Sequence, residues 1–116
     1  MKDFEKVKIT KRAEYVQKFA NAKKFISRYF VILYKNKQDL DNLRFGITVS
    51  RKVGGAVIRN KYKRIIRVLV KQCSFDGLDG ELSINIIAKK SIVQKKFIDI
   101  QNDFATCIGG ILKYEK

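Results

Sequence analysis

The segment RKVGGAVIRNKYKRIIRVLV, residues 51–70, combines basic and bulky aliphatic side chains without one acidic residue. If residues 56–71 form a helix, 100° per residue separates them into two faces. The polar face spans an arc of about 140° and contains Arg59, Asn60, Lys63, Arg64, Arg67 and Lys71. The opposing apolar face spans about 100° and contains Ile58, Tyr62, Ile65, Ile66 and Leu69. The segment therefore predicts an amphipathic helix that docks on a core and leaves a cationic face outside.

Docking does not by itself explain this cationic face. Solvated faces normally mix charges, whereas pairs four residues apart, such as Arg59 and Lys63, here repel by about 0.2–0.5 kcal/mol each. Arg59 also lies near the positive end of the helix dipole, just after Gly54 and Gly55, whose backbone N–H groups are open to approach. A phosphate would offset both effects, so the pattern favours a nucleic-acid-binding face.

Two alternatives to nucleic acid remain for this face: an amphipathic helix on a membrane surface, and a face that is merely solvated. The membrane interpretation conflicts with the expected use of Ile58, Ile65 and Leu69 in the core of a small domain. No GxxxxGK[ST] motif is present, which argues against a site for an isolated nucleotide.

Composition points to one basic domain. The chain has 116 residues, of which 46% are hydrophobic, enough for a single core, and we predict one RNA-binding domain over residues 1–116. The formal charge of +15 predicts a polyanionic partner. No signal-like segment and no apolar run near the ~20 residues of a membrane span is present, so we expect a cytoplasmic protein.

The residue inventory argues against catalysis by the protein. The chain has no histidine, which removes most nucleophile pairs, imidazole acid–base chemistry and most zinc sites. Cys73 and Cys107 lie in no CxxC spacing and are interpreted as reduced core thiols. Asp76, Asp79 and Glu81 miss the spacing of a calcium loop. We therefore predict no catalytic residue and no metal site on this chain.

The remaining patterns predict a mixed α+β sandwich. Helices are expected at 11–20, with Thr10 as N-cap, and at 93–112, where Gly109 and Gly110 weaken the last turn. Strands are expected at 25–34, 43–50 and 82–89, with a hairpin loop at 35–42 and a short extra strand at 22–25. On the first helix, Tyr15 and Phe19 lie along the flank of the apolar face, where core packing is one interpretation.

The segment LRFGITVSRKVGGAVIRNKYKRIIR resembles the protein component of bacterial ribonuclease P, the ribonucleoprotein that removes 5′ leaders from precursor tRNA. The family shows a similar strand, a basic pair, Gly-x-Ala-Val and then Arg-Asn-Arg-x-x-Lys-Arg-x-x-Arg. The likeness extends more weakly over AEYVQKFANAKKFISRYFVILY and INIIAKKSIVQKKFIDIQNDF. Lys61 replaces the family's second arginine of Arg-Asn-Arg, which keeps the charge and loses the bidentate fork.

The resemblance implies a single-domain α-β-β-β-α-β-α sandwich with a left-handed βαβ crossover. The same fold is found in the second domain of a ribosomal protein of the small subunit. It implies contacts with the catalytic RNA through Arg51, Lys52, Arg59, Asn60, Lys61, Lys63, Arg64 and Arg67. It further implies a cleft between the first helix and the sheet, in which Tyr15 and Phe19 hold the single-stranded leader of the substrate.

The resemblance also implies a division of labour. The partners that it implies for this protein are ribonuclease P RNA and precursor tRNA, with no membrane and no small-molecule substrate. The holoenzyme needs Mg²⁺, which we expect the RNA to hold, because this chain lacks a convincing carboxylate cluster and its working face is cationic. The alternatives are another structured-RNA-binding protein, such as a ribosomal or tRNA-binding protein, and a self-sufficient nuclease, which the residue inventory disfavours.

Overall fold

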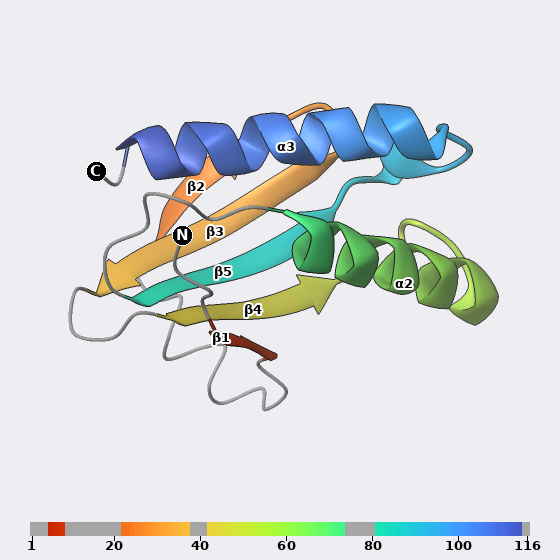
Figure 1. Cartoon of the computed structure of the whole chain (residues 1–116). Helices are drawn as coiled ribbons and strands as arrows, with labels where there is room; N and C mark the ends of the chain where they lie inside the picture. The colour runs from red at the N-terminus through yellow and green to blue at the C-terminus, as the bar shows by residue number, and fades with distance from the viewer. Residues whose placement is uncertain (1–4, 9–21, 38–41, 74–80, 115–116) are drawn as a thin grey trace.

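The computed structural model describes residues 5–8, 22–37, 42–73 and 81–114. Within these residues the chain forms a single sheet with both α-helices on one of its faces (Figure 1), a two-layer α+β arrangement. In chain order the elements are β1 (Glu5–Lys8), β2 (Lys23–Ile26), β3 (Phe30–Lys37), β4 (Asn42–Thr48), α2 (Ala56–Gln72), β5 (Glu81–Ala88), the 3-10 helix η1 (Lys90–Ile92) and α3 (Phe97–Tyr114). The helix predicted at 11–20 lies outside the described residues.

The sheet runs in the order β1-β4-β5-β3-β2. β5 is parallel to β4 and antiparallel to β3, so it separates two strands that are consecutive in the sequence. The predicted hairpin at 35–42 is therefore wrong, because β3 and β4 do not pair. Side-chain alternation identifies each strand, whereas its neighbours are selected by packing across the whole sheet. The sequence EKVK of β1 contains one β-branched residue and gives little signal for a strand.

The segments β4, α2 and β5 form a βαβ crossover of unusual hand. The two strands are parallel, and α2 lies on the viewer's side of the sheet in Figure 1. When the strands are turned to point upward, β5 lies to the left of β4, which makes the crossover left-handed. Since about 98% of such crossovers are right-handed, only the resemblance predicted this hand, and the structure confirms it.

The core lies between the sheet and the two helices. On the helix-facing side, Ile32 of β3 pairs with Ile86 of β5, and both are fully buried. From α3, Phe104 places its ring at a steep angle to that of Phe30, with the centroids 5.5 Å apart, a favourable edge-to-face arrangement. Cys107 is buried in this core, as predicted, and forms no disulfide.

The strand predicted at 25–34 is divided in two by a tight turn. Ser27 stabilises the turn, since its N–H donates to the carbonyl of Phe30 at 2.8 Å. The carboxylate of Asp103 on α3 accepts hydrogen bonds from Ser27 Oγ at 2.7 Å and from the N–H of Tyr29 at 2.9 Å. Lys89 Nζ donates to the Ser27 carbonyl at 3.0 Å. The turn therefore depends on residues more than 60 positions away, which local patterns do not identify.

The C-terminal helix begins later and ends later than its predicted span of 93–112. The 3-10 helix η1 and a left-handed residue, Gln94 with φ of 64°, precede its first residue, Phe97. It continues through both glycines to Tyr114. A Cβ at Gly110 would overlap the ring of Phe25 on β2, so this glycine permits close approach of helix and sheet.

Candidate nucleic-acid interface

Helix α2 packs on the domain with one face and projects beyond the sheet at its start. Its first turns extend past the end of β4 (Figure 1). Its buried residues are Tyr62, Ile66, Leu69 and Val70. Ile58, predicted to pack in the core, is 41% exposed, because it lies on the projecting part of the helix. The predicted apolar face is therefore correct for the second half of α2 and wrong for its first turn.

A tight turn leads from β4 into the helix. The N–H of Val53 donates to the carbonyl of Ser50 at 3.0 Å, and the Val53 side chain is buried. Arg51 and Lys52 occupy the exposed corner of this turn. Their placement beside the start of α2 agrees with the predicted grouping of this basic pair with the helix.

The two glycines before α2 differ in their surroundings. At Gly54 a Cβ would lie 3.0 Å from the side chain of Ile58, so the backbone here passes close to the helix. Gly55 is the N-cap, and a Cβ added to it would meet nothing within 4 Å. No side chain caps the helix and no acidic residue lies in its first turn. The start of α2 is accessible and electropositive.

The structure groups most of the predicted RNA-contact residues on one side of this helix. We call this group the basic surface; it consists of Arg51, Lys52, Arg59, Asn60, Lys63, Arg64 and Arg67. Each of them is exposed or half-buried. Its cations form no ion pair with another residue in the described part of the chain. Within the described residues, these charges therefore have no acidic partner that would neutralise them.

Arg59 is the member of the basic surface with a buried polar atom that lacks a hydrogen-bond partner among the described residues. Its Nε is buried and has no hydrogen-bond partner. Buried polar atoms are nearly always paired, and an unpaired donor on a cation costs about 1–3 kcal/mol. At the accessible start of α2, Arg59 Nε is therefore a donor for which the described residues supply no acceptor.

Lys61 differs from the rest of the predicted set. At 100° per residue it lies about 200° around α2 from Arg59, and its Nζ is 5.6 Å from the ring centroid of Tyr62. It is exposed on the side of the helix nearer α3. Lys61 is therefore far from Arg59 around the helix but only about 60° from Arg64, so it borders the basic surface.

The predicted leader-binding residues Tyr15 and Phe19 lie outside the described residues. The sheet face turned away from α2 and α3 is described, and it carries both polar and apolar side chains. Thr48 Oγ1 donates to Asn85 Oδ1 at 3.2 Å and Arg44 pairs in register with Ser83, while Val31 pairs with Ile87 on the same face. Alternation in the segment LRFGITVS predicted Arg44 and Thr48 on this face. Asn85 and Ser83 could have been found in the same way from LSINIIAK.

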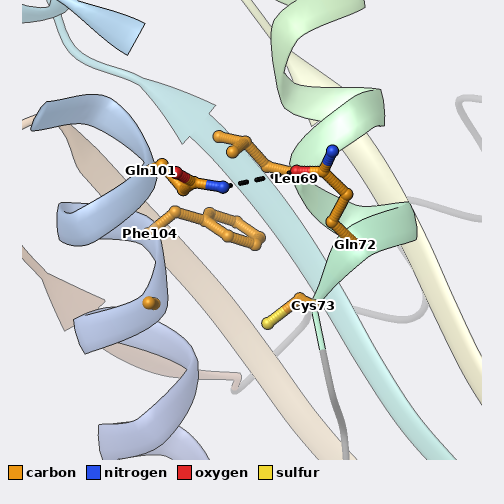
Figure 2. A pocket seen from close by; sticks show the side chains of 6 residues that line it. Leu69, Gln72, Cys73, Gln101 and Phe104 are labelled. Atoms are coloured by element: carbon orange, nitrogen blue, oxygen red, sulfur yellow. Dashed lines mark hydrogen bonds between the residues drawn. The ribbon is translucent and has the colours of Figure 1, made fainter. Parts of the chain in front are cut away.

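A groove separates the end of α2 from α3 (Figure 2). It encloses about 250 Å³ and is lined by Leu69, Gln72, Cys73, Gln101, Phe104 and Ala105. Gln101 Nε2 donates a long hydrogen bond of 3.4 Å to Gln72 Oε1 across it. Cys73 is half-buried at this groove rather than fully in the core, so its prediction as a core thiol is only partly correct.

Neither metal binding nor membrane crossing finds support in the described residues. They contain no group of three or more His, Cys, Asp or Glu side chains that could hold a metal ion. Asp76 and Asp79 lie outside them. Among the described helices, none is both long enough and apolar enough to cross a bilayer.

Fold and surface together define a class: small α+β proteins whose left-handed βαβ crossover carries a cationic helix. A family model described as Ribonuclease P matches residues 4–111. The Ribonuclease P protein component of Geotalea uraniireducens is 37% identical over 107 residues, covering 91% of each chain. That of Bacillus cereus strain Q1 is 32% identical over 96 residues, covering 83% of each. The chain belongs to the ribonuclease P protein family.

Solved structures agree with this assignment. The RNase P protein of Staphylococcus aureus superimposes with a TM-score of 0.78 at 30% identity, covering 94% of this chain and 97% of its own. That of Thermotoga maritima gives a TM-score of 0.74 at 25% identity with the same coverage. The predicted family and fold class are confirmed.

Proposed function

We propose that this chain acts in the cytoplasm as the subunit that binds ribonuclease P RNA through the basic surface and assists removal of the 5′ leader from precursor tRNA. One observation carries this proposal. Helix α2 bears six cations and no acid, begins beyond the edge of the sheet, and its basic surface has no ion pair among the described residues. A phosphate backbone supplies the missing counter-charges.

The chemistry belongs to the RNA subunit in this proposal. Hydrolysis of a phosphodiester commonly uses divalent ions that activate water and stabilise the charged oxygens. The described residues offer no cluster of donors for such an ion, and the basic surface would repel it. The protein would instead screen the repulsion between two RNA molecules, which lowers the Mg²⁺ concentration that their association requires.

The leader would be held on the opposite side of the sheet from α2. Tyr15 and Phe19 would stack on its unpaired bases, with the sheet face that includes Arg44 and Asn85 as the other wall of the cleft. This placement leaves the basic surface to the catalytic RNA. The protein would thus contact both RNA molecules on separate faces.

Reconstitution with a bacterial ribonuclease P RNA and a precursor tRNA tests the function. The protein alone should not cleave the precursor with any divalent ion, whereas added to the RNA it should lower the Mg²⁺ requirement and favour precursor over mature tRNA. Replacing Asp76, Asp79 and Glu81 with Asn and Gln should leave the cleavage rate nearly unchanged. Site-specific cleavage by RNA-free protein would contradict the assignment of the chemistry to RNA.

A further inference from the structure

The start of α3 carries a second group of charged and apolar side chains that the basic surface does not include. Lys95 and Lys96 immediately precede the helix and are exposed. In its first turn, Phe97 is 43% exposed and Ile98 is 54% exposed. We call these four residues the α3-start surface. Two large apolar side chains in water beside two cations are unfavourable for a protein that acts alone.

This surface is fixed in position relative to α2. The N–H of Gln94 donates to Tyr62 Oη at 2.9 Å, and Tyr62 is buried in the middle of α2. The segment is also held at Ile92, which is fully buried and whose carbonyl accepts from the N–H of Lys95 at 3.3 Å. Gln94 adopts a left-handed conformation, with φ of 64°, that few side chains favour. A partner would therefore meet a preformed surface.

Charge identifies the chemistry of that partner. Lys95 and Lys96 form no ion pair with another described residue, and the acid nearest in sequence, Asp99, is exposed in the same first turn of α3. Lys61 adds an exposed cation on the side of α2 nearer α3. A second copy of this chain is disfavoured, because each copy carries a charge of +15. Cations beside an exposed aromatic ring suit single-stranded nucleic acid, in which phosphates alternate with flat bases.

Position identifies which nucleic acid is bound. Helices α2 and α3 lie on the same face of the sheet, and both begin at the same end of the molecule (Figure 1). An RNA bound at the start of α2 therefore lies at the same end of the molecule as the start of α3, which the hydrogen bond from Gln94 to Tyr62 holds beside α2. The precursor's leader is assigned to the other face of the sheet. The α3-start surface thus continues the contact with the RNA subunit.

We propose that Lys95, Lys96, Phe97 and Ile98 form a second contact with ribonuclease P RNA. Phe97 stacks on an unpaired base, Ile98 packs beside it, and the two lysines neutralise neighbouring phosphates. This inference rests on the proposed function, since it takes the RNA subunit as the partner of α2. It extends the interface from one helix to the starts of both.

The test measures the affinity of the full chain for ribonuclease P RNA over a series of salt concentrations. The double variant K95A/K96A should reduce the slope of log K against log salt by about 1.4–1.8, because two phosphate contacts are lost. The matched control K95R/K96R keeps both charges and should retain the wild-type slope. Wild-type slopes in K95A/K96A, with the melting temperature unchanged, would overturn the proposal.

The aromatic contact has its own pair of variants. Phe97→Leu keeps an apolar side chain and should weaken RNA binding about fivefold or more without changing the salt slope, whereas Phe97→Tyr keeps the ring and should bind like wild type. Equal RNA affinities of the Phe97→Leu variant and wild type would show that Phe97 does not stack on a base. If the losses appear only in binding of precursor tRNA to the assembled holoenzyme, the assignment to the RNA subunit is wrong. Failure of the wild-type protein to stimulate the RNA would instead contradict the proposed function.

Discussion

Helices α2 and α3 cover the same face of one sheet, yet they use their charged residues in opposite ways. Helix α2 carries six cations and no acid, and its basic surface forms no ion pair among the described residues. In α3, Asp103 accepts two hydrogen bonds from the β2–β3 turn and so holds two strands in place. Asp103 of α3 therefore stabilises the fold, whereas the cations of the basic surface on α2 are available to a partner.

Replacements on the two helices should therefore affect two different quantities, RNA affinity and the free energy of unfolding. Changes on α2 should alter RNA affinity and leave the free energy of unfolding nearly constant, because its cations repel one another in the free protein. Changes in the buried part of α3 should do the reverse. The start of α3 is the exception, since Phe97 and Ile98 in its first turn are exposed.

The largest effect is expected from Arg59, Lys63 and Arg67 on α2. If each neutralises one phosphate, replacing all three with Ala should reduce the slope of log K against log salt by about 2–3. The loss of RNA affinity caused by a tenfold rise in salt should then be about 100- to 1000-fold smaller for the variant than for wild type. Binding of ribonuclease P RNA over a salt series measures this. The Lys63→Arg variant serves as a control that keeps the charge. An unchanged slope in the folded triple variant would remove α2 from the interface.

The second effect concerns Asp103 on α3. Asp103→Ala should lower the free energy of unfolding by about 2–4 kcal/mol, because two hydrogen bonds to a charged acceptor are lost and the β2–β3 turn is released. Urea denaturation measures the loss, and the salt slope of RNA binding should stay at its wild-type value. A stable variant with a changed salt slope would reverse the roles that we assign to the two helices.

The third effect is a pH dependence that belongs to α3. Burial raises the pKa of the Cys107 thiol from 9.0 to about 11, against the opposing hydrogen bond with Ser27. The thiol then stabilises the fold fully below pH 9, and its contribution, on the order of 3 kcal/mol at most, is lost as pH rises toward 11. Cys107→Ala should lack this component, so wild type should lose more stability than the variant between pH 9 and 11. Parallel pH profiles would mean that Cys107 does not titrate in this range.

The smallest effect comes from two adjacent glycines in α3. Gly110→Ala should destabilise the protein by about 1–3 kcal/mol, because the added methyl overlaps the ring of Phe25. At Gly109 an added methyl meets nothing within 4 Å, so Gly109→Ala should stabilise the protein by up to about 1 kcal/mol through the higher helix propensity of Ala. Thermal unfolding of the two single variants gives the comparison directly. Similar destabilisation by both would show that the close approach of Phe25 is unimportant.

Several features could be predicted from local sequence because they depend on side-chain periodicity. Residues 56–71 separate into polar and apolar faces, and α2 forms at Ala56–Gln72. The segments around β4 and β5 alternate or are rich in β-branched residues, and both form strands. The excess of cations on α2 follows from its composition and spacing alone. These are properties of one segment at a time, so a single chain reveals them.

The sequence by itself thus determined the class of fold, the amphipathic helix and the charge that points to a polyanion, because hydrophobic period and net charge are local or additive. Only the tertiary structure decided that β5 lies between β3 and β4, that Asp103 holds a distant turn, and that Gly110 makes room for Phe25. It also decided that the first turns of α2 extend past the end of β4 and that Ile58 and Phe97, in the first turns of the two helices, stay exposed. These features depend on which segments meet in space, and that choice is made by packing the whole chain at once.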